Sequence, residues 1–66
     1  MTTAEMLEFI ADKRNKQADV AEKLHIFLAA KQHGGADWPL IGNAILQRWS
    51  MAGLKRINDL AWKMGQ

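Results

Sequence analysis

The chain has 66 residues, a net charge of +2, 48% hydrophobic residues and no cysteine. This length allows one domain, residues 1–66, and the hydrophobic content argues against disorder. The absence of cysteine excludes disulfides. No apolar run reaches the roughly 18 to 20 residues that cross a bilayer. The acidic start "MTTAEMLEF" lacks the basic segment of a signal peptide. We therefore expect a cytoplasmic protein that does not act on a membrane.

The first predicted helix begins near the N-terminus, where "TTAE" offers a capping box. Thr2 is the expected cap and Glu5 follows three residues later, so that each side chain can accept the other residue's backbone N–H. Met6, Phe9 and Ile10 then share one helical face.

The polar segment "DKRNKQ" that follows leaves two arrangements open. Residues 3–33 form either one continuous helix or two helices divided between Asn15 and Ala18. One helix would be roughly 46 Å long at about 1.5 Å per residue, and would need a second copy to bury its far end. We favour the break, with Asp19 as the new cap and Glu22 at the reciprocal position.

The second predicted helix runs from about Val20 to the segment "HGG". Glycine readily adopts the positive φ angles that close a helix C-terminus. Four apolar side chains share one face of this helix: Val20, Leu24, Phe27 and Leu28.

The third predicted helix follows Asp37 as its cap and has Pro39 in its first turn, where a missing N–H costs little. Large apolar side chains then recur at spacings of three and four, and Gly42 at their border is expected to let another helix approach closely. This stripe comprises Trp38, Ile41, Ile45 and Trp49. We expect both tryptophans to belong to the core.

Ser50 is the expected cap of the last helix, which follows a very short turn, "SMAG", and runs to about Met64. A helical projection places Trp62 away from the expected core face. That core face comprises Leu54, Ile57, Leu60, Ala61 and Met64. The fold we predict is all-α, a small bundle of three to four short helices whose last two form a helix-turn-helix-like pair.

The inventory of reactive side chains argues against an enzyme. Ser50 is the only serine, and the chain has neither cysteine nor tyrosine. His25 and His33 are eight residues apart, roughly 12 Å along a helix axis, which is too far to share a metal ion without further ligands. We expect no catalysis, no cofactor, no metal and no small-molecule substrate.

The charge distribution favours an anionic partner for the second half of the chain. Residues 1–37 hold five basic and six acidic residues, whereas residues 38–66 hold four basic and one acidic residue. In a helix-turn-helix, Lys55 and Arg56 would meet phosphate or guanine and Asn58 would meet adenine.

Two functions therefore stay open: DNA binding through the last helix, as a possible homodimer, and a protein–protein interaction module, such as a small regulator or inhibitor, anchored by Trp62. Gln47 and Arg48 could contact the DNA backbone in the first case. The partner is then either nucleic acid or a larger protein. The candidate binding residues are Gln47, Arg48, Lys55, Arg56, Asn58, Trp62 and Lys63.

Overall fold

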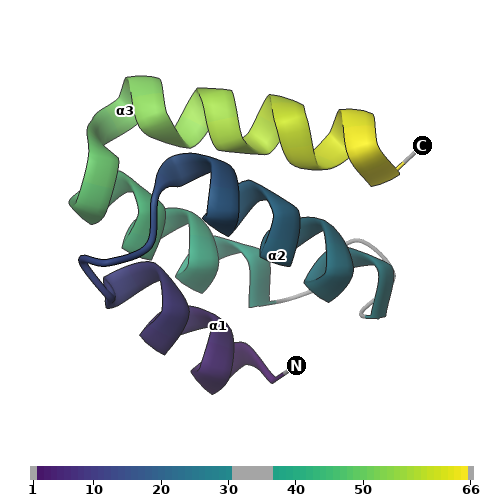
Figure 1. The fold of residues 1–66 in the computed structure, drawn as a ribbon, viewed down its shortest axis with the longest axis horizontal. Coiled ribbons are helices and arrows are strands. Elements are labelled where there is room, and N and C mark those ends of the chain that lie inside the picture. The colour runs from purple at the N-terminus through teal and green to yellow at the C-terminus, as the bar shows by residue number, and fades with distance from the viewer. Residues whose placement is uncertain (1, 31–36, 66) are drawn as a thin grey trace.

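The computed structural model describes residues 2–30 and 37–65, and every regular element in these residues is helical. The helices are α1 (Thr3–Ala11), α2 (Gln17–Ala30) and α3 (Trp38–Gly65), which fold into one small bundle (Figure 1). The expected all-α class and bundle architecture are confirmed.

Helix α3 is bent sharply at Ser50, where φ is 72° and ψ is 179°. It therefore has a first arm, residues 38–49, and a second arm, residues 51–65, which turns back over the bundle (Figure 1). The two arms are the expected last pair of helices. Their connection is one non-helical residue, shorter than the three or four residues that separate the helices of a helix-turn-helix.

The N-terminus of α1 carries the predicted capping box. Glu5 donates its backbone N–H to Oγ1 of Thr2, and Thr2 donates its own N–H to Oε1 of Glu5, both at 3.2 Å. The backbone hydrogen bond from Thr2 stabilises the carboxylate and lowers the pKa of Glu5, with the Thr2 side chain adding to the effect.

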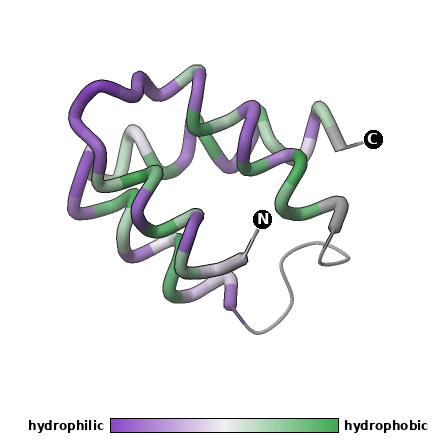
Figure 2. Tube along the Cα trace, turned by 60° about the horizontal axis from the view of Figure 1, so that its bottom comes forward, coloured by the Kyte–Doolittle hydropathy of each residue, from purple (hydrophilic) through white to green (hydrophobic). Residues whose placement is uncertain are grey.

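The expected break between α1 and α2 is confirmed, but it lies at residues 12–16 and therefore begins three residues earlier than the predicted Asn15. Side chains close the end of α1. Asn15 donates its Nδ2 hydrogen to the carbonyl oxygen of Phe9 at 2.8 Å. The carboxylate of Asp12 accepts the backbone N–H of Arg14 at 3.0 Å and its guanidinium at 2.8 Å. Such local bonds compete with helix formation, so the chain leaves the helix here without glycine or proline. The connection is a hydrophilic stretch of the trace (Figure 2).

The predicted start of α2 was wrong by three residues. The helix begins at Gln17, so Asp19 lies inside its first turn and is not the cap. Its carboxylate accepts the backbone N–H of Lys16 at 3.1 Å, where the positive end of the helix dipole favours an acidic side chain. The expected end of this helix at "HGG" lies outside the described residues.

The core draws on all three helices, and the predicted stripe of the first arm belongs to it. Ile41 and Ile45 are fully buried, and Trp38 and Trp49 are half-buried against them. Asp37 precedes α3 directly, and its carboxylate accepts a hydrogen bond from the Thr3 hydroxyl, which joins the starts of α1 and α3. The buried apolar residues are Met6, Ile10, Val20, Ala21, Leu24, Phe27, Leu28, Ile41, Ile45, Ile57 and Ala61.

Gly42 does not provide the close approach that we expected of it. A Cβ atom built there would lie 3.9 Å from Cδ1 of Leu54, which is ordinary contact. The tight position is Gly53, in the second arm.

Candidate functional site

The second arm of α3 buries a different line of residues from the one predicted. Gly53, Ile57 and Ala61 are buried at every fourth position. Leu60 and Met64 are exposed by 37% and 45%, so their predicted place in the core was wrong. The buried line passes to one side of Leu60, and Met64 lies in the last turn of the helix.

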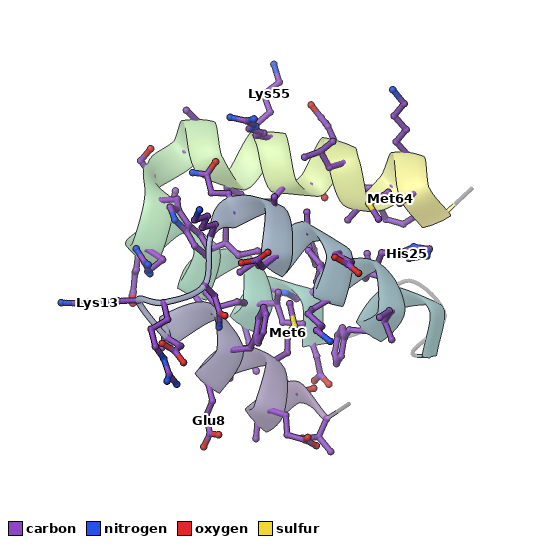
Figure 3. The ribbon with its side chains drawn as sticks, in the orientation of Figure 1. Met6, Glu8, Lys13, His25, Lys55 and Met64 are labelled. Atoms are coloured by element: carbon purple, nitrogen blue, oxygen red, sulfur yellow. The ribbon has the colours of Figure 1, made fainter. Side chains whose placement is uncertain are left out.

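One exposed side of this arm, which we call the outer face, consists of Ala52, Lys55, Arg56, Asp59, Leu60 and Lys63. The first five of these residues line a shallow hollow. Figure 3 shows Lys55 pointing away from the bundle, on the side opposite to Glu8 of α1. The hollow therefore opens to solvent, away from the core.

The outer face has an excess of positive charge. The face carries three basic residues, Lys55, Arg56 and Lys63, and one acidic residue, Asp59. None of these four side chains forms an ion pair within residues 2–30 and 37–65. Exposed cations on one helical face attract anions at a distance of about one Debye length, roughly 8 Å at physiological salt. The face is thus suited to an anionic partner.

Asn58 and Trp62 lie beside the outer face rather than on it. The indole Nε1–H of Trp62 donates to Oδ1 of Asn58 at 3.0 Å. Asn58 is half-buried, and its carbonyl oxygen is already engaged. Trp62 is exposed by 39%, in accord with its expected position away from the core.

Gln47 and Arg48 belong to a different part of the molecule. They line a hollow between α1 and the first arm of α3, together with Ile10, Ala11 and Ala44. Arg48 has a structural role, because its Nη2 donates to the carbonyl oxygen of Lys13 at 3.3 Å and its guanidinium lies 4.8 Å from the ring centre of Trp49. It holds the α1–α2 connection against α3.

The seven candidate residues therefore divide among three places. Lys55, Arg56 and Lys63 are together on the outer face, Asn58 and Trp62 form a hydrogen-bonded pair beside it, and Gln47 and Arg48 lie near α1. The sequence analysis missed Ala52 and Leu60. Ala52 lies three residues before Lys55 and four before Arg56, and Leu60 lies four residues after Arg56. This helical spacing is the signal that could have found them.

Other kinds of site find no support in the described residues. No three His, Cys, Asp or Glu side chains among them are close enough to hold a metal ion. None of the described helices has the length and apolar content to cross a membrane. His33 lies outside the described residues.

Comparison with protein-family models, with curated proteins and with solved structures gave no match.

Proposed function

We propose that the protein binds nucleic acid, in the first instance duplex DNA, through the outer face of α3. The observation that carries this proposal is the exposed group of Lys55, Arg56 and Lys63, which have no ion-pair partner in the described residues. Cations that replace condensed counterions on phosphates supply most of the affinity of a non-specific nucleic-acid complex.

The position of these residues in the second arm supports the same proposal. Lys55 and Arg56 lie in the first turns after the bend at Ser50, and Lys63 lies two turns further on. Reading helices in DNA complexes present their N-terminal residues to the groove while neighbouring side chains contact phosphates. Asp59 lies between these cations and repels phosphate, so the face is expected to bind with modest affinity.

The test is a titration of labelled duplex DNA, followed by fluorescence anisotropy over a series of salt concentrations. We expect affinity to fall steeply as salt rises, with a slope of about −0.9 for each phosphate contacted. Replacing Lys55 by Ala should reduce this slope by about one, because one phosphate contact is lost.

The matched control is Lys23→Ala, which removes the same charge from an exposed position on α2. It should leave the slope unchanged. Equal effects of the two substitutions would mean that only net charge matters, and no binding at low salt would end the proposal.

A protein partner is the second candidate, and exposed apolar side chains near the C-terminal end of α3 favour it. Leu60, Trp62 and Met64 are exposed by 37%, 39% and 45%. Tryptophan is enriched among the residues that dominate protein interfaces, and methionine adapts to irregular partner surfaces.

This second candidate makes a separable prediction. Trp62→Ala should weaken binding to a protein partner isolated with the wild-type chain, whereas the double change Lys55→Ala and Arg56→Ala should leave it bound. The reverse pattern with DNA would favour the nucleic-acid proposal.

A further inference from the structure

We propose that the second arm of α3 binds single-stranded nucleic acid in preference to duplex, with Trp62 stacking on an unpaired base while the neighbouring cations contact phosphates. This inference rests on the proposed function and adds the state of the strand to it. Trp62 is exposed by 39%, and Lys63 follows it directly in the chain. Proteins that hold single strands combine cations along the backbone with aromatic rings on which the bases stack.

Trp62 and Lys55 lie on the same side of the second arm. They are seven positions apart, which is close to two helical turns and roughly 10 Å along the helix axis. Both side chains are exposed. A strand that follows the arm can therefore place a phosphate at Lys55 and a base against Trp62.

The indole ring of Trp62 is oriented by Asn58, one turn earlier on the same helix. Its Nε1–H donates to Oδ1 of Asn58 at 3.0 Å, and Asn58 is itself half-buried. This bond engages the edge of the indole, whereas a base stacks on the face of the ring. A ring that is held before binding loses less conformational freedom when a base stacks on it, which favours the complex.

The one acid of the outer face, Asp59, also favours unpaired bases. Its exposed carboxylate lies three residues before Trp62 and four after Lys55. It repels the phosphates of a duplex laid along the arm, because like charges repel. The bases of a single strand can instead turn toward the helix, where a carboxylate accepts hydrogen bonds from amino groups such as N4 of cytosine. The acid among these cations therefore fits a single strand better than a duplex.

The bend in α3 argues in the same direction. Ser50 alone separates the two arms, so they are joined more tightly than the helices of a helix-turn-helix. Gln47 and Arg48, which would contact the DNA backbone beside a reading helix, line a hollow next to α1 instead. A single strand that follows the second arm needs neither of these features.

The test is fluorescence anisotropy at low salt with three labelled probes. These are a short strand without self-complementarity, the same strand annealed to its complement, and a strand of equal length in which abasic residues replace the bases. The abasic strand keeps the phosphates but offers nothing to stack. We expect the wild-type chain to bind the normal strand more tightly than the duplex, and to bind the abasic strand roughly 5- to 150-fold more weakly, the range for one stacked base.

Variants of the full chain assign this loss to Trp62. Trp62→Ala should reproduce it on the normal strand, while its affinity for the duplex should change by less than about two-fold. Trp62→Phe keeps an aromatic ring and should recover most of the lost affinity. The matched control is Met64→Ala, which removes an apolar side chain exposed by 45% from the same arm and should leave all three affinities unchanged. Circular dichroism verifies that each variant folds.

The outcomes separate this inference from the proposed function. Duplex binding as tight as single-strand binding, or equal affinity for the normal and abasic strands, would overturn the inference and leave nucleic-acid binding in place. An equal loss on strand and duplex in Trp62→Ala would overturn it as well. A variant Trp62→Ala that binds every probe like the wild type but loses a protein partner would assign Trp62 to the protein interface. No binding to any probe would remove the proposed function and the inference together.

Discussion

Gly53 lies directly against Trp49 across the bend in α3. A Cβ atom on Gly53 would be 2.3 Å from the Cβ of Trp49 and 3.1 Å from Nε2 of Gln17. Carbon atoms in favourable contact are about 3.5 to 4.0 Å apart, so the site has no room for a side chain. The missing side chain at position 53 lets the second arm fold back onto the first arm and onto the start of α2.

Gly53→Ala should therefore destabilise the protein. We expect the free energy of unfolding to fall by about 1 to 3 kcal/mol, the usual cost of overpacking, measured by urea denaturation. Gly42→Ala is the control, because the new Cβ would be 3.9 Å from Leu54, which is ordinary contact. The higher helix propensity of alanine should then raise the free energy of unfolding by as much as about 1 kcal/mol. Equal losses from the two substitutions would contradict this account of the bend.

The backbone of Ser50, at the bend in α3, has a conformation that glycine adopts more easily than serine does. Its φ of 72° and ψ of 179° fall in a region that costs a non-glycine residue about 1 to 3 kcal/mol. Ser50→Gly relieves this strain but adds roughly 0.5 to 1 kcal/mol of chain entropy to the unfolded state, so we expect a net gain of about 1 kcal/mol. Ser50→Ala keeps the strain, and a variant with Ala that is more stable than the one with Gly would refute the assignment.

Ile57 and Leu60 test which side of the second arm faces the core. Ile57 is fully buried, so Ile57→Ala should lower the free energy of unfolding by about 2 to 5 kcal/mol. Leu60 is on the outer face, so Leu60→Ala should change it by less than about 0.5 kcal/mol. Thermal unfolding followed by circular dichroism measures both. A large loss at Leu60 would mean that the helix is rotated relative to the structure.

Asp12 should make stability depend on pH in the acid range. Hydrogen bonds from the side chain and backbone of Arg14 lower the pKa of Asp12 from 3.8 to about 2. Because the folded-state pKa is depressed, the ionised group stabilises the fold above its ordinary pKa and this contribution disappears as the pH falls through about 2.

Asp12→Asn should thus be less stable than the wild type at neutral pH. The difference between their melting temperatures should shrink as the pH falls from 3.8 to about 2. A difference that stays constant with pH would show that the Asp12–Arg14 pair does not stabilise the α1–α2 connection.

Much of the fold could be predicted because helical periodicity and capping are local properties. The capping box at Thr2 and the stripe of the first arm depend only on residues within a few turns. The end of α1 was harder to place, since it depends on Asn15 reaching back to the carbonyl of Phe9 and on Asp12 holding Arg14. Those bonds compete with a helix that the same residues could also form.

The candidate site was only partly predictable. A helical projection treats every apolar residue as part of the core, so it included the exposed Leu60 and Met64. The predicted core face was therefore displaced from the buried line, which passes through Gly53, Ile57 and Ala61. Arg48 looked like a free cation because its partner, the carbonyl oxygen of Lys13, is distant in sequence. The shared exposed face of Lys55, Arg56 and Lys63 could be predicted, because residues of one helix need no tertiary contact to share a face.

The most direct test of nucleic-acid binding by the outer face is an NMR titration of isotope-labelled protein with duplex DNA at low salt. We expect the amide shifts that change to cluster on the second arm, at Ala52, Lys55, Arg56, Asp59 and Lys63, and to return to their free values as salt is added. Changes confined to α1 or α2, or an unchanged spectrum at low salt, would contradict the account.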